Sequence, residues 1–401
     1  MLEGRRFWFV GIGGAGMSAL ALVAREWGAE VGGSDRARSS YVDRLEEAGV
    51  PVAIGHDASQ VPDGAELIVS SAIAPDNPEL VGHDTRKRGE LLAELVALRP
   101  SIVVAGAHGK TTTAGMIAFS LDRLGLDPAF LIGGEIPQLD GNARAGDGWL
   151  VAEGDESDRS LELLRPRIAV VTNVELDHHA TFASEREVRE LFDRWLAEAP
   201  AQVRGEDLEP ASIELGVPGE HNRRNAAVAI AALELADVPR ADAERILPEF
   251  RGVGRRFEQR GEAAGVRVFD DYGHHPSEIA ATLAAARLDV DGGRVLVVFQ
   301  PHLYSRTRHL AAELAGALAA ADAVAVTDVY AAREDPAPGV SGKLIVDALV
   351  AERPGMPVAW TPTVEEAVRF LARRVRPGDL VLTIGAGDVE RAGQLILEEL
   401  A

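Results

Sequence analysis

The sequence predicts an α/β protein of three domains with mostly parallel sheets. Short apolar runs alternate with longer amphipathic segments along nearly the whole chain, a pattern typical of repeated strand–helix–strand units. The length of 401 residues corresponds to about two to four domains of ~100–200 residues. Candidate boundaries lie at residues 99–100 and at the Gly-rich joint 252–254, so we predict domains over residues 1–98, 99–254 and 255–401.

Each predicted strand is a short apolar run, and each predicted helix has apolar residues at helical spacing. The strands are expected at residues 6–10, 30–33, 67–71, 102–105, 150–153, 168–172, 266–269, 295–299, 323–327 and 380–384. The helices are expected at residues 14–27, 87–98, from 110 onward, 185–198, 222–236, 276–285, 307–320 and 364–374. Residues 199–219 are rich in Pro, Gly and acidic residues and have little periodicity, which indicates a loop or a reduced substructure.

The composition argues against several classes of protein. Lys and Arg total 41 and Asp and Glu total 63, for a net charge of -22, so neither nucleic acid nor an anionic membrane is expected as the main partner. The chain has no cysteine, which excludes disulfides, thiolate metal sites and a cysteine nucleophile. Because there is no apolar run of about 18 residues and no secretion signal, we expect a cytoplasmic protein.

The first glycine-rich segment, residues 11–16 (GIGGAG), fits the pattern G-x-G-x-x-G between a strand and a helix. Glycines at these positions let the backbone approach a diphosphate at the helix N-terminus. Asp35 follows at the end of the second strand, where a contact to a ribose hydroxyl is expected. The segment indicates a diphosphate-bearing ligand without saying which one, so a nicotinamide oxidoreductase stays open as a hypothesis, as does a glycine turn that binds nothing.

The second glycine-rich segment, residues 102–113 (IVVAGAHGKTTT), runs from a strand into a helix. Lys110 is one of only three lysines in the chain, and it would reach the β- and γ-phosphates of a nucleotide, while the Thr111 hydroxyl would bind Mg²⁺. The general P-loop pattern is incomplete, because Val104 stands where its first Gly belongs. An ordinary turn with a surface lysine is the alternative.

Further polar clusters follow predicted strands, at the ends where open α/β sheets place their ligands. Residues 152–158 (AEGDESD) and 172–181 (TNVELDHHAT) offer carboxylates and imidazoles that could hold Mg²⁺ against the phosphates of ATP. In the last third of the chain, Arg306 and Arg308 are candidates to bind a substrate carboxylate, and His274 or His275 could bind an amine. The segment 219–225 (GEHNRRN) could read a base edge, or its first Asn could simply cap a helix.

These stretches together resemble the Mur ligase family. They occur in family order over nearly the whole chain: GIGGAGMSALA (11–21), SSAIAPDNPE (70–79), AHGKTTT (107–113), LVAEGDESD (150–158), VTNVELDHHATF (171–182), HNRRNAA (221–227), GRRFE (254–258), DDYGHHP (270–276), FQPHLYSRTR (299–308) and GAGD (385–388). The resemblance implies a Rossmann-like N-terminal domain that binds a UDP-sugar, a central P-loop ATPase-like domain that binds ATP, and a Rossmann-like C-terminal domain that brings the amino acid.

The activity implied by the resemblance is ATP-dependent ligation of L-alanine to UDP-N-acetylmuramate through an acyl phosphate, in peptidoglycan precursor synthesis. ATP and Mg²⁺ would be the cofactors, and the protein would be a monomer or a weak homodimer. Two alternatives of other specificity or class stay open: a murein-peptide recycling ligase and the nicotinamide oxidoreductase. The segment between residues 182 and 219 is shorter than is typical of the family, which motivates a third alternative, a non-catalytic binder of nucleotide-sugars.

The resemblance also implies roles for individual residues. The catalytic residues would be Lys110, His178, His275 and Arg306. The ATP-binding residues would be Gly106, His108, Gly109, Lys110, Thr111, Thr112, Asn222, Asn225, Arg255 and Asp270. The UDP-sugar-binding residues would be Gly13, Ala15, Gly16, Ser34, Asp35, Ser71 and Ser157. The metal ligands would be Thr111, Glu153 and His178.

Overall fold

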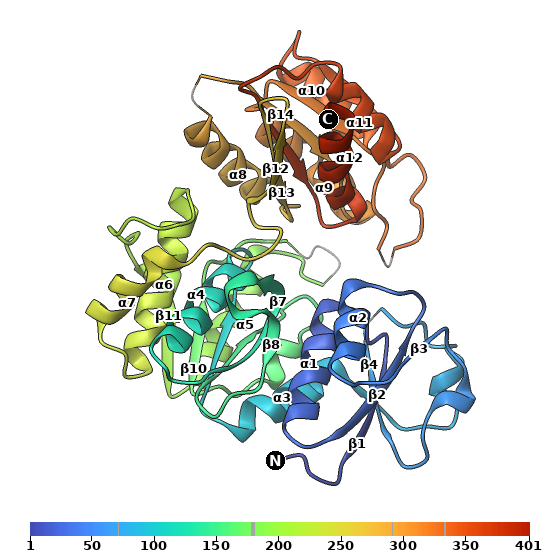
Figure 1. The fold of residues 1–401 in the computed structure, drawn as a ribbon, viewed down its shortest axis with the longest axis vertical. Helices are drawn as coiled ribbons and strands as arrows, with labels where there is room; N and C mark the ends of the chain where they lie inside the picture. The colour runs from blue at the N-terminus through green and yellow to red at the C-terminus, as the bar shows by residue number, and fades with distance from the viewer. Residues whose placement is uncertain (71, 178–180, 291, 333) are drawn as a thin grey trace. The chain divides into compact units, whose positions relative to one another are not determined.

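The strands of the described residues form three sheets, one within each predicted domain range, and α-helices connect many of the successive strands (Figure 1). The computed structural model describes residues 1–70, 72–177, 181–290, 292–332 and 334–401. Contacts divide the chain into two compact units. Unit 1 comprises Met1–Glu175, Glu185–Glu214 and Arg224–Arg251, and unit 2 comprises Leu176–Ser184, Leu215–Arg223 and Gly252–Ala401. The predicted α/β fold class is confirmed, while the two predicted domain limits stay predictions.

The first sheet of unit 1 is parallel throughout, in the order β3-β2-β1-β4-β5. Its strands are β1 (Arg6–Val10), β2 (Glu30–Asp35), β3 (Val52–Ile54), β4 (Glu66–Val69) and β5 (Thr85–Lys87). Its helices are α1 (Ala15–Glu26), α2 (Ser40–Glu47) and α3 (Arg88–Leu98). From β1 the chain adds β2 and β3 on one side of the sheet and then β4 and β5 on the other. The direction in which strands are added therefore reverses between β1 and β4. Ligands of open α/β sheets bind at such a reversal point, beyond the carboxyl ends of the strands.

The second sheet of unit 1 has the order β11-β10-β6-β9-β7-β8, and only its β7–β8 pair is antiparallel. Its strands are β6 (Ser101–Ala105), β7 (Ala129–Ile136), β8 (Gly141–Arg144), β9 (Leu150–Glu153), β10 (Ile168–Val171) and β11 (Ala201–Arg204). Its helices are α4 (Lys110–Arg123), α5 (Glu185–Ala197), α6 (Glu220–Leu235) and α7 (Arg240–Ile246). The range expected as a loop, 199–219, therefore contains the strand β11 and a 3₁₀ turn at Gly205–Asp207, while residues 199–200 and 208–219 lack regular structure.

The sheet of unit 2 has the order β12-β13-β17-β14-β15-β16, with β12 antiparallel to β13. Its strands are β12 (Glu258–Ala263), β13 (Val266–Asp271), β14 (Val295–Phe299), β15 (Ala323–Val326), β16 (Val358–Trp360) and β17 (Leu380–Ile384). Its helices are α8 (Pro276–Asp289), α9 (Tyr304–Leu318), α10 (Lys343–Glu352), α11 (Val364–Ala372) and α12 (Arg391–Leu400). Helices cover both faces, because Val297 of β14 belongs to one apolar cluster and Val298 to another.

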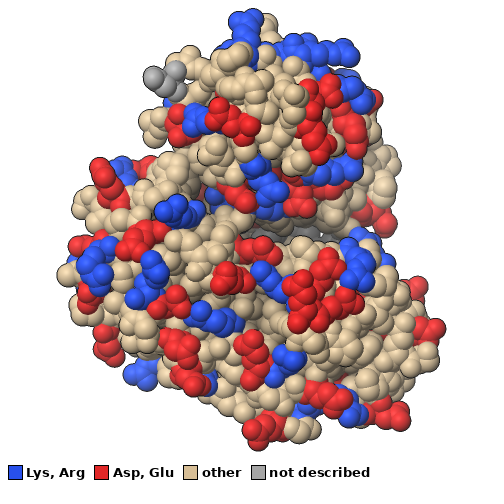
Figure 2. Space-filling model, in the orientation of Figure 1, with Lys and Arg blue, Asp and Glu red and all other residues tan. Residues whose placement is uncertain are grey.

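On the face of the molecule drawn in Figure 2, acidic and basic side chains are interspersed. Among the described residues, several Arg–carboxylate pairs lie within ion-pair distance, for example Arg38–Asp43, Arg189–Glu206 and Arg240–Glu234. Such exposed pairs contribute little to stability. In the described part of the chain, none of the helices combines the length and the apolar character needed to span a membrane.

Candidate active site

The first glycine loop, residues 11–16, joins the carboxyl end of β1 to α1 at the reversal point of the first sheet. Gly11 has a φ of +83°, and a Cβ on Gly13 would lie 2.8 Å from Val42 Cγ2, so both positions need glycine. The backbone N–H of Gly13 donates to Asp35 Oδ2 at 2.8 Å, which fixes the loop to the end of β2. No side chain of the described residues caps α1, so its first N–H groups can meet an anion.

The predicted UDP-sugar residues gather only partly at this loop. Asp35 binds it directly, and the carbonyl of Ser34 accepts from the N–H groups of Gly11 and Ile12. Ser157 instead follows β9, where its N–H donates to Asp155 Oδ1 at 2.8 Å. Ser71 lies outside the described residues.

Arg88 is a residue of this region that sequence reasoning missed. A Cβ on Gly16 would lie 3.0 Å from its Nη1, so the guanidinium packs against the first glycine loop. Its Nη2 is 3.3 Å from Asp155 Oδ2, in the acidic segment after β9. The positive charge of Arg88 beside the first glycine loop would favour binding of a ligand that carries phosphate. The signal available in the sequence was its place at the start of the helix predicted over residues 87–98.

The second missed feature is a carboxylate buried beneath the first sheet's carboxyl edge. Glu79 is 0% exposed, and its Oε2 accepts from the indole N–H of Trp8 and from the hydroxyl of Ser34, both at 2.8 Å. The other oxygen, Oε1, lies 3.0 Å from His56 Nδ1. Three polar partners around one buried acid explain why Ser34 stays in place at the end of β2.

The second glycine loop, between β6 and α4, depends on two glycines with positive φ. Gly106 has φ +125° and Gly109 has φ +76°, and a Cβ at either position would collide with the side chain of Thr172 or Asn225 respectively. Gly109 also stands at the N-cap of α4, where no side chain of the described residues competes for the N–H groups. The loop is therefore built to bring backbone N–H groups close to an anion.

Lys110, at the first position of α4, reaches across the mouth of this loop. Its Nζ donates to the carbonyl of Ala107 at 3.3 Å and lies 3.1 Å from Glu156 Oε1. Burial lowers the pKa of the ammonium, but the charges of Glu156 and Asp155 outweigh burial and hold the pKa above its ordinary value. The lysine is a fixed cation at the predicted phosphate position, and Glu156 is a partner that sequence reasoning did not single out.

Two of the three predicted metal ligands lie together. The Thr111 hydroxyl donates to Glu153 Oε2 at 3.0 Å, and the N–H of Gly133 donates to Glu153 Oε1 at 2.6 Å. A hydroxyl and a carboxylate are the oxygen ligands that Mg²⁺ prefers, so these residues fit that ion. His178, the third predicted ligand, lies outside the described residues.

The end of β10 holds the second glycine loop in place. The N–H of His108 donates to Asn173 Oδ1 at 2.9 Å, and the carbonyl of His108 accepts from Thr172 Oγ1 at 2.6 Å. Its Nε2 lies 3.1 Å from Glu175 Oε2. His108 therefore belongs to the loop as predicted, and the segment after β10 acts on the loop through Thr172, Asn173 and Glu175.

The two asparagines predicted to bind ATP lie at the start of α6. Asn225 belongs to unit 1, and its amide lies against Gly109. Asn222 belongs to unit 2, and its Nδ2 donates to the carbonyl of Pro218 at 2.7 Å. Because α6 begins at Glu220, the alternative interpretation of Asn222 as the residue that caps this helix is wrong.

In unit 2, Arg255 and Asp270 form one cluster, although fifteen positions separate them. Arg255 Nε donates to Asp270 Oδ2 at 2.8 Å, and its Nη2 donates to the carbonyl of Gly385 at 2.7 Å. Asp270 is 0% exposed. The neighbouring Asp271 has its pKa raised to about 6, chiefly by burial.

Arg306 lies in the first turn of α9 and is 4% exposed. Its Nε and Nη2 both donate to Asp177 Oδ1, at 2.9 and 2.6 Å, and its Nη1 lies 2.9 Å from His302 Nδ1. The His302 ring packs edge-on against His274, with 5.6 Å between centroids. Sequence reasoning singled out Arg306 but gave Asp177 no role.

Of the two adjacent histidines, His274 is the one beside this cluster, with Nε2 3.9 Å from Asp177 Oδ2. Burial and the charge of Arg306 lower the pKa of His274 to about 4, so its ring is neutral at pH 7. His275, the predicted catalytic residue, stands at the N-cap of α8, where its Nδ1 accepts from the N–H of Ser277 at 3.5 Å. His275 therefore caps the N-terminus of α8. Its predicted catalytic role stays a prediction.

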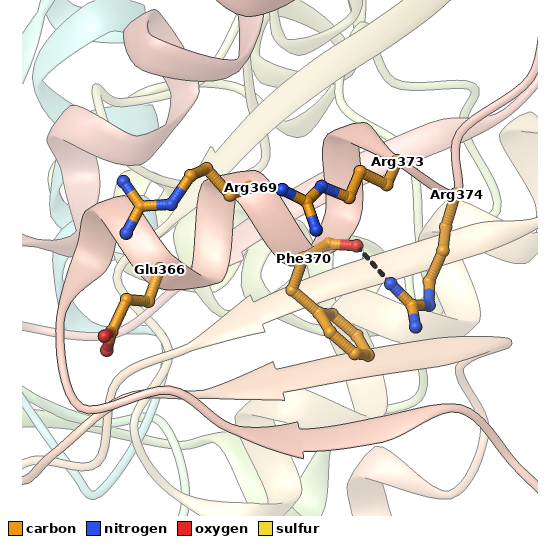
Figure 3. A pocket seen from close by; sticks show the side chains of 5 residues that line it. All are labelled: Glu366, Arg369, Phe370, Arg373 and Arg374. Atoms are coloured by element: carbon orange, nitrogen blue, oxygen red, sulfur yellow. Dashed lines mark hydrogen bonds between the residues drawn. The ribbon is translucent and has the colours of Figure 1, made fainter.

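A surface pocket of about 290 Å³ in unit 2 lies along α11, lined by residues from Glu366 to Arg374 (Figure 3). Arg374 covers the ring of Phe370 at 3.7 Å from its centroid and donates to the Phe370 carbonyl. The carbonyl of Arg374 accepts from Arg294, which directly precedes β14. The Arg374 end of the pocket thus lies at the amino end of β14, opposite the edge at which open α/β sheets bind ligands.

The chain matches two family descriptions and is similar to known proteins over nearly its whole length. The family description "Mur ligase family, catalytic domain" matches residues 6–99, and "Mur ligase, glutamate ligase domain" matches residues 255–387. The UDP-N-acetylmuramate–L-alanine ligase of Kineococcus radiotolerans is 46% identical, with 99% of this chain and 96% of the relative covered. That of Rubrobacter xylanophilus is 42% identical, with 98% and 99% covered.

A solved structure is also similar over its whole length. The crystal structure of UDP-N-acetylmuramate–alanine ligase MurC from Thermotoga maritima superposes with a TM-score of 0.83, at 28% identity and with 98% of each chain covered. The alignment with the Kineococcus protein spans 458 positions against 401 residues here, so that relative carries internal residues which this chain lacks. With two matching family descriptions and relatives of more than 40% identity over nearly its full length, the chain belongs to the Mur ligase family.

Proposed function

We propose that the protein joins L-alanine to UDP-N-acetylmuramate with ATP as the energy source, through an acyl phosphate. The observation that carries this proposal is the arrangement of Lys110, Thr111 and Glu153 at the carboxyl ends of the neighbouring strands β6 and β9. A cation, a hydroxyl and a carboxylate around a glycine loop are what the transfer of a phosphoryl group from ATP requires. The substrates are those named for the relatives of more than 40% identity.

The nucleotide would bind with its β- and γ-phosphates over the second glycine loop. Backbone N–H groups at the start of α4 would contact the phosphate oxygens, and Lys110 would leave Glu156 to neutralise the transferring group. Thr111, Glu153 and His178 would hold Mg²⁺. When bound, this ion supplies charge neutralisation on the β- and γ-phosphates.

The first chemical step is phosphoryl transfer to the lactyl carboxylate of UDP-N-acetylmuramate. One carboxylate oxygen bonds to the γ-phosphorus, the bond between that phosphorus and the bridging oxygen breaks, and ADP leaves with the electron pair. The first glycine loop would hold the sugar nucleotide through its diphosphate, at the N-terminus of α1. Arg88, beside Gly16, would add a positive charge at this diphosphate.

The second step is amide formation. The unprotonated amine of L-alanine bonds to the acyl carbon, the carbon–oxygen bond to phosphate breaks, inorganic phosphate leaves, and the amine loses a proton to water. The protein's main task here is to orient the amino acid. Arg306 in unit 2 would bind its carboxylate, as a guanidinium suits a planar anion.

Phosphate release under defined substrates tests the proposal. The full-length protein is assayed with ATP, Mg²⁺ and UDP-N-acetylmuramate, and with L-alanine, glycine, L-serine or no amino acid. We expect release that depends on all of the components and is fastest with L-alanine, with the ligated product seen by mass spectrometry. Release that does not depend on UDP-N-acetylmuramate would contradict the proposal, and no turnover with any amino acid would support the non-catalytic alternative.

Two further measurements test the remaining alternatives, the recycling ligase and the nicotinamide oxidoreductase. A tripeptide of L-alanine, D-glutamate and diaminopimelate replaces the amino acid, and faster ligation of the tripeptide would favour a recycling ligase. Membership in the Mur ligase family does not favour the nicotinamide oxidoreductase, which would leave the second glycine loop without a task. NAD(H) is titrated against the protein with UDP-N-acetylmuramate as a competitor, and we expect only the sugar nucleotide to bind.

A further inference from the structure

Asp177 belongs to a short segment of unit 2, although the chain on both sides of that segment belongs to unit 1. Within this segment, the side chain of Asp177 is 5% exposed and faces Arg306 of α9, whose side chain is 4% exposed. The ion pair joins residues 129 positions apart and is buried. Burial of two charges costs free energy, and well-packed apolar residues in their place are often equally stable or more stable. The pair therefore calls for a reason other than stability.

The contacts fix the orientation of the guanidinium. Arg306 Nε and Nη2 form one edge of the group, and Asp177 Oδ1 accepts from both. Because an arginine N–H can only donate, His302 Nδ1 accepts from Nη1, and a neutral His302 then carries its proton on Nε2. A guanidinium has five N–H bonds. These contacts engage three of them and leave one on Nη1 and one on Nη2 with no acceptor among the described residues.

We propose that Asp177 is a positioning residue that turns Arg306 so that its remaining Nη1–H and Nη2–H face the carboxylate of the amino-acid substrate. This inference rests on the proposed ligase function. A carboxylate accepts two parallel N–H bonds from such a donor pair, and the match requires the guanidinium to be held at a fixed angle. Asp177 itself touches Arg306 and not the substrate, so it acts through the arginine.

The proposal separates the amino-acid step from the phosphoryl step. Without Asp177, Arg306 would keep its charge but lose its orientation, so capture of L-alanine would suffer while activation of the sugar acid would continue. Hydroxylamine makes this distinction measurable, because it attacks an acyl phosphate but has no carboxylate for Arg306 to bind. A role of Asp177 in stability alone would affect both amines equally.

The test compares Asp177→Asn, Asp177→Glu and a matched control, Asp289→Asn. The control removes an Asp–Arg pair of unit 2, between Asp289 and Arg267, that is about one-third exposed. For Asp177→Asn we expect the KM for L-alanine to rise about tenfold or more, as loss of orientation at a reacting centre predicts. The KM values for ATP and UDP-N-acetylmuramate, and the rate of hydroxamate formation with hydroxylamine, should stay within about twofold of wild type.

The other variants complete the test. Asp177→Glu keeps the negative charge and should restore part of the L-alanine affinity, and Asp289→Asn should leave every constant unchanged. Equal losses with L-alanine and hydroxylamine, or an unchanged KM for L-alanine in Asp177→Asn, would overturn the proposal. Failure of the ligase function itself has a different signature, since wild-type protein would then release no phosphate in response to L-alanine.

Discussion

Thr111 and Glu153 are joined by a hydrogen bond of 3.0 Å from the hydroxyl to Oε2. They come from neighbouring parallel strands, since β6 leads into the loop before Thr111 and β9 ends at Glu153. The second carboxylate oxygen accepts from the backbone of Gly133, so the acid is held from two sides. Two oxygen donors of the kind that Mg²⁺ prefers therefore lie next to each other.

This arrangement predicts how Glu153 and Thr111 variants respond to Mg²⁺. Glu153→Gln removes the charge that attracts the ion, so we expect the Mg²⁺ concentration for half-maximal activity to rise about tenfold or more. Thr111→Ser keeps the hydroxyl and should behave like wild type, whereas Thr111→Val should resemble Glu153→Gln. Mn²⁺ binding by electron paramagnetic resonance provides the second readout, and unchanged Mn²⁺ affinity in Glu153→Gln would exclude the site.

The ion pair between Lys110 and Glu156 predicts that a double variant recovers stability without recovering activity. Lys110→Met leaves the 3%-exposed carboxylate of Glu156 without its cation, so the free energy of unfolding should fall by about 2 kcal/mol or more. The double variant Lys110→Met with Glu156→Gln should regain most of this loss in urea denaturation. Both variants should lack phosphoryl transfer, because the cation at the transferring group is missing. Substantial turnover in Lys110→Met would remove Lys110 from the proposed mechanism.

Mutation of Glu79 is expected to lower the stability of the fold strongly, although this residue is not one of the reacting groups. Glu79→Leu would leave the indole N–H of Trp8 and the hydroxyl of Ser34 without their acceptor in a buried site. We expect a loss of about 2–5 kcal/mol in the free energy of unfolding, together with weaker binding of the sugar nucleotide, because Ser34 borders the first glycine loop. Glu47→Leu on the exposed end of α2 is the control and should change stability by about 0.5 kcal/mol or less.

Asp271 predicts a pH dependence of stability with a defined sign. Burial raises its pKa to about 6 in the folded protein from an ordinary value of 3.8, although Arg256 and the N–H groups of Gly273 and Phe257 act in the opposite direction. The folded state therefore binds the proton more tightly. Protonation of Asp271 therefore stabilises the folded state by about 3 kcal/mol. This contribution to the free energy of unfolding is complete below pH 3.8 and is lost as the pH rises to about 6.

The measurement is the difference in unfolding free energy between wild type and Asp271→Asn across pH 4 to 7. Asparagine cannot ionise, so the variant should gain stability relative to wild type as the pH rises through this window. A difference that stays constant with pH would show that Asp271 does not titrate in this range.

The sequence predicted the central strands of each sheet and missed those at the edges. The four inner strands of the unit 2 sheet were all expected, whereas β12 and β16 at its edges were not. The same holds for β3 and β5, and for β8 and β11, although the inner strand β7 was also missed. Inner strands of parallel sheets are buried on both faces and so appear as unbroken apolar runs, while edge strands are short and polar. In β7 the pair Gly133–Gly134 interrupts the apolar run.

The sequence by itself determined the α/β fold class, the two glycine loops and the residues whose chemistry is local, such as Lys110 and Thr111. Strand–helix alternation and loop glycines are properties of neighbouring residues, so they can be read without the fold. Only the tertiary structure decided which polar side chains meet: Glu156 with Lys110, Asp177 with Arg306 and Glu79 with Trp8. These partners lie 46 to 129 positions apart, and the packing that brings them together and removes water from their charges is set by the whole sheet.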